Sequence, residues 1–147
     1  MHGPILSAIG ATLVAAEMSS LSDLADLVGN IHLVYESVGA SPLAFEVLKH
    51  VGVNGTFVFT GVPGRREAVK LDLDRVMRHL VLRNQVAFGT VNAGRESFDA
   101  AVRDLGEFVK RWPAAVRGLI TSRSPLEAAP TLLTTKPAGI KSVVAIG

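Results

Sequence analysis

The sequence predicts an α/β fold built on a parallel sheet, and two observations lead to this class. Through residues 11–95, short β-branched and aromatic runs alternate with helical patterns, which is typical of stacked strand–helix–strand units. Within GTFVFTGVPG (55–64), the run Thr56–Thr60 carries no charge and lies between glycines, as expected of a strand buried on both faces. Ligands bind at the carboxyl ends of such strands, so the exit at 61–64 is the first place to expect a site.

Local signals justify each element in order. Apolar runs predict the strands, and a capping residue before an amphipathic stretch predicts the start of a helix. Ser41 and Pro42 are a natural N-cap and first helical residue, and Ser124 with Glu127 has the spacing of a capping box. The expected helices cover residues 6–9, 21–28, 41–50, 72–82, 97–110 and 114–120, with a short one beginning at 124–127, and the expected strands cover residues 11–16, 31–37, 56–60, 84–89 and 141–146.

Length and composition fit one globular domain. The chain has 147 residues, of which 48% are hydrophobic and 19% charged. No apolar run approaches the ~18 residues of a membrane span and no signal peptide is visible, so we expect a cytoplasmic protein. The net charge is only +2 and the arginines are scattered, which argues against nucleic-acid binding. The chain has no cysteine and its four histidines lack metal-ligand spacing, so no metal site is expected.

Three expected strands end in small or glycine-containing segments, which would line one edge of the sheet if the strands are parallel neighbours. Glycine lets a ligand approach the backbone, and free N–H groups and short polar side chains can bind it. The alternative is that these glycines only end strands, and the pattern does not decide between the two. The segments are Ser37-Val38-Gly39, Thr60-Gly61-Val62 and Thr90-Val91-Asn92.

Single residues also have two interpretations each. Asn92 can bind a ligand, but asparagine also tolerates the left-handed backbone of turns, and by pattern alone the turn is favoured. Arg65-Arg66 can meet a phosphate, although a solvated loop is favoured. Glu36 is either a buried acid with a raised pKa or, as we prefer, a residue at the end of the sheet that reaches solvent. The G-x-G-x-x-G pattern of a dinucleotide pyrophosphate site is absent.

Three segments resemble the C-terminal part of prokaryotic glucose dehydrogenases, which belong to the zinc-dependent medium-chain alcohol dehydrogenase superfamily. They are NGTFVFTGVPGRR, LDLDRVMRHLVLRNQVAFGTVNAGR and PAGIKSVV, and TVNAGR and LVLRNQV are the most specific parts. The resemblance extends from about Ala8 to Gly147 and covers well under half of a complete family member.

In that family, NADP lies across the ends of a six-stranded Rossmann sheet. The resemblance therefore implies a partial Rossmann-like parallel sheet with flanking helices, whose exits at Ser37–Gly39, Thr60–Val62 and Thr90–Asn92 contact the nicotinamide half of the cofactor. It also implies that Asn92 contacts the sugar substrate and that Lys141 reaches the cofactor from the tail.

The family's zinc-bearing catalytic domain, its first two Rossmann strands and its glycine fingerprint have no counterpart in this sequence. The resemblance therefore implies a truncated NADP-binding portion with weak or no cofactor binding and no catalysis alone. A zinc-domain partner is one way to complete it. The runner-up is a non-catalytic dimerisation or interaction module built on the same scaffold, and a small-ligand binder at the strand exits is a third hypothesis.

The Rossmann strand order 3-2-1-4-5-6 makes residues 11–16 strand 3 and residues 31–37 strand 4. Without the strands that separate them, residues 11–16 must pair with 31–37, pair with another chain or leave the sheet. We therefore expect the N-terminal third to be rearranged.

The family also pairs its last Rossmann strand, here residues 84–89, across a two-fold axis, so the resemblance implies a homodimer. The expected organisation is a single domain over 1–147. It consists of a partial Rossmann half (8–95) and C-terminal helices with a terminal strand (96–147).

Overall fold

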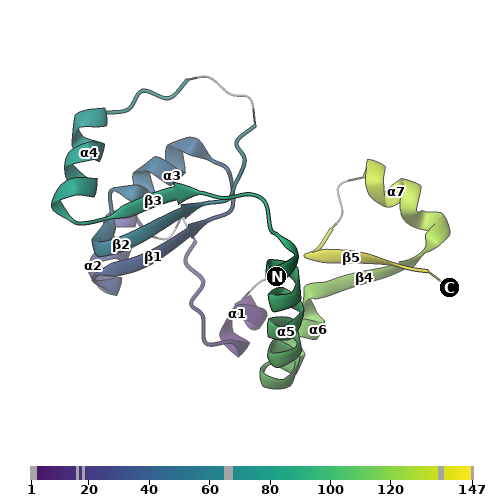
Figure 1. Cartoon of the computed structure of the whole chain (residues 1–147). Coiled ribbons are helices and arrows are strands. Elements are labelled where there is room, and N and C mark those ends of the chain that lie inside the picture. The colour runs from purple at the N-terminus through teal and green to yellow at the C-terminus, as the bar shows by residue number, and fades with distance from the viewer. Residues whose placement is uncertain (1–2, 16, 18, 65–67, 136–137, 147) are drawn as a thin grey trace. The chain divides into compact units, whose positions relative to one another are not determined.

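The chain divides into two compact units. The computed structural model describes residues 3–15, 17, 19–64, 68–135 and 138–146. One unit is Ala15–Asn92, and the other combines Met1–Val14 with Ala93–Gly147 (Figure 1).

The unit Ala15–Asn92 is a three-stranded parallel sheet with connecting helices. Its strands lie in the order β1-β2-β3, and every pair is parallel. A helix joins each strand to the next, as parallel pairing requires. This confirms the predicted α/β class. The elements are α2 (Leu21–Val28), β1 (Ile31–Glu36), α3 (Ser41–Leu48), β2 (Val51–Phe59), α4 (Leu73–Leu82) and β3 (Val86–Gly89).

The core of this unit lies on one face of β2. Val51 and Phe57 are fully buried, and Ala44 and Leu48 of α3 are 4% and 5% exposed beside them. Each fully buried side chain of this size contributes about 1.5–3 kcal/mol through loss of apolar surface to water. Partly buried hydrophobic residues from both helices and from β1 and β2 pack around this cluster, namely Val34, Phe45, Val47, Phe59, Val76 and Leu80. Helices α3 and α4 therefore cover the same face of the sheet.

The opposite face of the sheet is open and apolar. Leu33 and Tyr35 on β1 are 64% and 66% exposed, and Val86 and Phe88 on β3 are 55% and 47% exposed. The register places these residues beside Thr56 and Val58 of β2.

Strand β2 begins five residues before the predicted 56–60. Between the pairs Ile31–Val51 and Leu33–Thr56, β1 advances by two residues and β2 by five. The extra residues form a bulge in which Asn54 has φ +58°. Asn30 binds this bulge, since its Oδ1 accepts the Val53 N–H at 2.7 Å and its Nδ2 donates to the Val53 carbonyl at 3.1 Å. The Asn54-Gly55 turn signal thus lies inside the strand.

Helix starts were predicted with mixed success. Helix α2 has the predicted bounds, and Ser20 and Asp23 form its capping box. Asp72 caps α4 by accepting the Arg75 N–H at 3.0 Å. The prediction for Ser41 was wrong, because Ser41 is already helical and Ala40 is the N-cap, with no side-chain hydrogen bond. The chain enters α3 from Gly39, whose φ of +71° aligns the helix without a side-chain cap.

The predicted strand over residues 11–16 was also wrong. Residues 11–15 have no regular secondary structure, and residue 16 lies outside the described residues. The described part of this segment does not pair with residues 31–37, whose strand β1 pairs with β2. The apolar run resembles a strand locally, but no described neighbour pairs with it, and a lone strand cannot satisfy its backbone groups.

The second unit is mainly helical. Its α1 (Gly3–Ala8) packs against α6 (Pro113–Leu119), where a Cβ on Gly118 would contact Ile5 at 3.4 Å. The amphipathic α5 (Arg95–Arg111) begins two residues before the predicted 97–110 and ends one residue after it, with Trp112 as its C-cap. The Trp112 ring lies 5.6 Å from that of Phe108 and 4.6 Å from the Arg111 guanidinium, so it anchors the α5–α6 corner.

A two-stranded parallel sheet closes the second unit. The terminal strand β5 (Lys141–Ala145) was predicted, but its partner β4 (Ile120–Pro125) was not. The predicted helix start at Ser124 was wrong, because Ser124 pairs with Val144 in this sheet. A 3₁₀ turn, η1 (Leu126–Ala128), and α7 (Ala129–Thr134) follow instead. Non-local pairing with β5, supported by the Ser122–Ser142 hydroxyl bond at 2.8 Å, overrides the local capping pattern.

None of the described helices is both long and apolar enough to cross a membrane.

Replacing Phe57 by alanine should destabilise the unit Ala15–Asn92 by about 3–5 kcal/mol, because it leaves a cavity beside Val51. Urea unfolding measures this loss. Tyr35→Ala is the matched control, since Tyr35 lies in the same sheet but is 66% exposed, and it should cost about half as much or less. Equal losses would contradict the assignment of the core to the helix-covered face.

Candidate functional site

The exits of β2 and β3 form one open hollow. Because these strands are parallel neighbours, their carboxyl ends meet at the same edge of the sheet. The hollow has a volume of about 540 Å³, and Phe59–Pro63 and Gly89–Asn92 line it. It brings together six of the predicted site residues, namely Thr60, Gly61, Val62, Thr90, Val91 and Asn92.

The exit of β1 lies against the exit of β2 on the side of α3. Gly39 and Gly61 line a second hollow of about 250 Å³, together with Ala44 and Phe45 of α3. Ser37 and Val38 are exposed, and neither belongs to the lining of either hollow. Lys141 is exposed at the start of β5 in the other unit, so its role at the cofactor stays a prediction.

The Glu36 carboxylate binds the backbone of the segment that follows β1. Its Oε1 accepts the N–H groups of Val38 at 2.8 Å and Gly39 at 2.6 Å. Glu36 is half-buried at the end of β1, so it is the sheet-end residue that we preferred, although its carboxylate binds the loop. The sequence carried a signal for this role, because an acid two residues before a segment that turns at glycine can accept its backbone N–H groups.

The Glu36 backbone carbonyl also binds the segment that follows β2. Its carbonyl accepts the N–H groups of Thr60 at 2.8 Å and Gly61 at 3.1 Å, and the Thr60 hydroxyl at 2.8 Å. The N–H groups expected to be free at Val38, Gly39, Thr60 and Gly61 are therefore engaged within the protein.

The presence of glycine at positions 39 and 61 is explained by the close contact between the two loops that carry them. A Cβ on Gly61 would lie 2.7 Å from Gly39 Cα, and a Cβ on Gly39 would lie 2.7 Å from the Val62 carbonyl oxygen. Real Cβ atoms do not approach this closely, so both positions require glycine without any ligand.

The exit donors without an acceptor among the described residues belong to Ser37 after β1, Val62 after β2, and Val91 and Asn92 after β3. The Thr90 N–H donates to the Phe59 carbonyl at 3.0 Å. For the N–H groups of Val62, Val91 and Asn92 we find no acceptor among the described residues. Asn92 is exposed and does not have a positive φ; among described non-glycine residues only Asn54 and Asn84 do. The left-handed turn that was the alternative explanation for Asn92 is therefore not used.

Other candidate groups fall outside these hollows. Arg65 and Arg66 lie outside the described residues. In the part of the chain that the structure covers, no three His, Asp or Glu side chains are grouped so that they could hold a metal ion.

A family model and individual relatives point to the same protein family. The model of the family described as "Glucose dehydrogenase C-terminus" matches residues 2–146. The glucose 1-dehydrogenase of Methanocella arvoryzae is 27% identical over 97% of this chain, and glucose 1-dehydrogenase 2 of Vulcanisaeta moutnovskia is 31% identical over 99%. This chain spans only 40% of the length of either relative.

Solved structures share the fold. The Haloferax mediterranei glucose dehydrogenase in complex with NADP, Zn and gluconolactone aligns with a TM-score of 0.82 and 24% identity, over 98% of this chain and 39% of that one. The 2R,3R-butanediol dehydrogenase of Bacillus subtilis aligns with a TM-score of 0.71 and 14% identity, over 98% of this chain and 40% of that one. These likenesses confirm a Rossmann-like dehydrogenase fold.

Replacing Glu36 by alanine should free the Val38 and Gly39 N–H groups, because their shared acceptor is lost. Their amide hydrogen exchange should accelerate by roughly tenfold, the equivalent of about 1.4 kcal/mol, while that of Val58 changes little. Glu46→Ala is the matched control, since Glu46 pairs only with Lys49 at the surface of α3. Unchanged exchange at Val38 and Gly39 would show that Glu36 does not hold the loop.

Proposed function

Because this chain belongs to the family of glucose dehydrogenase C-terminal domains, we propose that it forms the NADP-binding portion of a glucose dehydrogenase-like oxidoreductase. One observation carries the proposal. The N–H groups of Val62, Val91 and Asn92, which have no acceptor among the described residues, lie at an open hollow at the carboxyl ends of two parallel strands. Cofactors bind at this edge in doubly wound α/β folds. The NADP complex of the Haloferax mediterranei enzyme supports the choice of cofactor.

The hollow suits one half of a dinucleotide. Its volume of about 540 Å³ lies within the ~300–1,000 Å³ of small-molecule sites. The Val62 and Val91 N–H groups can donate to amide and phosphate oxygens, and the Asn92 amide can both donate to and accept from hydroxyl groups. NADP, when bound, would supply hydride acceptance. Asn92 also lies at the hollow's rim, where it could meet a sugar.

Cofactor binding and catalysis are separate parts of the proposal. Zinc and gluconolactone belong to the Haloferax enzyme complex, and the described residues of this chain offer no group of metal ligands. The sequence also lacks a G-x-G-x-x-G turn to hold a pyrophosphate. We therefore propose weak NADP binding and no glucose oxidation by this chain alone, with a zinc-bearing partner domain as the element that would complete the site.

We also propose a homodimer, in which β3 pairs with its copy. β3 is an outer strand of the described sheet, and an unpaired strand edge is a template for pairing with another chain. The exposed Val86 and Phe88 would add apolar contact beside the two-fold axis. This surface is also what favours the alternative function, a non-catalytic dimerisation module.

Titration with NADP should raise the melting temperature of the chain by a few degrees at about ten times the dissociation constant, which corresponds to about 1.4 kcal/mol. Asn92→Ala should abolish most of this shift. Ser97→Ala should not, because Ser97 is an exposed residue of α5 outside the hollow. Absence of stabilisation by millimolar NADP or NAD would remove the cofactor-binding proposal.

Light scattering should give a dimer mass for the unmodified chain. Phe88→Lys should convert the dimer into a monomer, because pairing of β3 with its copy would bring like charges close together. Tyr35→Lys introduces the same charge on the other outer strand, β1, and should leave the dimer intact. A monodisperse monomer for the unmodified chain would contradict the proposal.

A further inference from the structure

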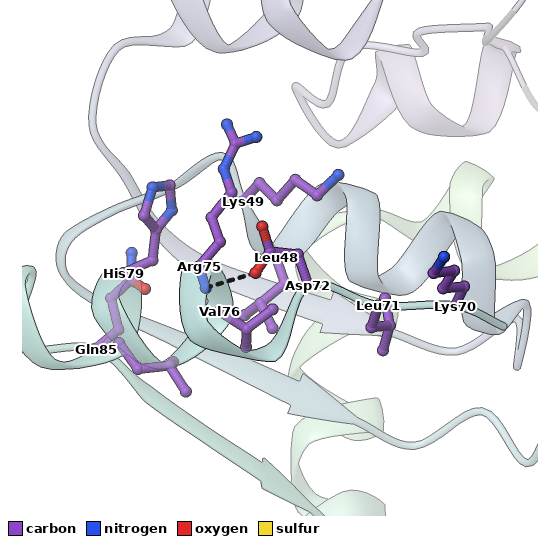
Figure 2. Close-up of a pocket in the computed structure, with 10 residues that line it drawn as sticks. Leu48, Lys49, Lys70, Leu71, Asp72, Arg75, Val76, His79 and Gln85 are labelled. Atoms are coloured by element: carbon purple, nitrogen blue, oxygen red, sulfur yellow. Dashed lines mark hydrogen bonds between the residues drawn. The ribbon is translucent and has the colours of Figure 1, made fainter.

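A pocket lies on the helix-covered side of the sheet, far along the strands from the exits. It has a volume of about 110 Å³ and is built within the unit Ala15–Asn92 (Figure 2). The end of α3, the segment before α4 and α4 itself form its walls. Lys49 precedes β2 and Gln85 precedes β3, so the pocket lies at the amino ends of these strands, whereas the strand exits lie at their carboxyl ends.

The pocket has an apolar part and a cationic part. Leu48, Leu71, Val76 and Leu80 supply the apolar lining. In Figure 2, the charged ends of Lys49 and Arg75 extend to one side of the pocket, while Val76 and Leu71 lie toward the other. A molecule that fits both parts must carry a negative charge on a short apolar body.

The cationic part has few carboxylates to neutralise it. The lining holds three cationic side chains, Lys49, Lys70 and Arg75, against one carboxylate, that of Asp72, whose Oδ1 also accepts the Arg75 backbone N–H. Lys49 pairs with Glu46, and among the residues that the structure describes no carboxylate pairs with the Arg75 guanidinium or with Lys70.

Gln85 favours one orientation of a bound ligand, in which its negatively charged end lies away from the inner wall of the pocket. Its Nε2 donates to the carbonyls of Val51 at 2.6 Å and Gly52 at 3.2 Å, which fixes the orientation of the amide. Its Oε1 is then buried with no hydrogen-bond donor among the described residues. A buried amide oxygen without a donor presents a partial negative charge in the inner wall, which disfavours a carboxylate there and favours one at the cationic side.

We propose that this pocket binds a small organic carboxylate, with the carboxylate on the Arg75 guanidinium and an apolar body against Leu71 and Val76. The planar guanidinium matches a carboxylate with two parallel hydrogen bonds. The volume is somewhat below the ~150 Å³ of a cavity that holds benzene, so the ligand has about four to six non-hydrogen atoms.

Butyrate is a suitable probe. Titrated at constant ionic strength into the ¹⁵N-labelled full chain, it should cause saturable shifts in the backbone amides of Lys49, Val76 and Leu80, with a dissociation constant of about 1–10 mM. Arg75→Gln should weaken binding by about tenfold. Arg78→Gln is the matched control on the same helix. Arg78 belongs to the wall of a different hollow with Met77 and Val81, and its replacement should change the affinity less than twofold.

Three comparisons can overturn the proposal. Equal affinity for butyramide, which has the same shape without the charge, would exclude recognition of an anion. Equal or tighter binding of inorganic phosphate would exclude the apolar body. Equal effects of Arg75→Gln and Arg78→Gln would show general charge screening. The Asn92→Ala variant should bind butyrate normally, so failure of this proposal and failure of the NADP proposal are distinguishable.

His79 provides a second readout in the same pocket. Burial lowers its pKa below 6.5, and the positive charges of Arg83 and Arg75 lower it further. The other charged groups around the pocket are Lys49 with its partner Glu46, and Lys70 and Asp72 before α4. A bound carboxylate stabilises the imidazolium, so saturating butyrate should raise the midpoint of the His79 side-chain titration. By linkage, affinity should increase as the pH falls through that midpoint. A midpoint unchanged by saturating butyrate would place the ligand elsewhere.

Discussion

The burial of β2 between two parallel neighbours is the constraint on which the described sheet depends. Phe57 and Val51 on this strand form the centre of the core, and both connecting helices pack on the face that they occupy. Pairing on both sides also brings the exits of β1 and β3 to those of β2. The same strand therefore supplies the fully buried side chains of this unit and brings the strand exits together.

The strand exits show how a glycine-rich loop can be structural in one part and available for binding in another. Gly39 and Gly61 allow two loops to touch, and Glu36 occupies the backbone donors beside them. On the side of β3, the donors of Val62, Val91 and Asn92 have no acceptor in the described part of the chain. The candidate cofactor site is thus narrower than the three exits that the sequence pointed to, and it centres on Asn92.

Much of the fold could be predicted because its signals are local. The apolar spacing of residues 21–28 predicts the bounds of α2, and the uncharged run at 56–60 identifies the central strand. Where the signal is non-local, prediction failed. Residues 120–125 are polar and become a strand only because β5 lies beside them, and residues 11–15 look like a strand but have no partner.

The site was predicted less completely than the fold. Parallel topology was enough to bring Thr60–Val62 and Thr90–Asn92 together. The engagement of Glu36 with two loops and the cationic pocket of Arg75 depend on side-chain directions that sequence spacing alone does not supply. Resemblance to a family pointed to the exits, whereas nothing comparable pointed to the pocket at the opposite end of the strands.

The bulge at the start of β2 gives the two ends of the sheet different mechanical properties. At the amino end, the side chains of Asn30, Arg83 and Gln85 bind the β2 backbone between Val51 and Val53, which joins three segments of the chain. At the β3 side of the carboxyl end, the N–H groups of Val62, Val91 and Asn92 have no acceptor in the part of the chain that the structure describes. Local opening should therefore cost more free energy at the bulge than at the exits. A ligand that arrives at the exits can order its surroundings while the opposite end of the sheet keeps its register.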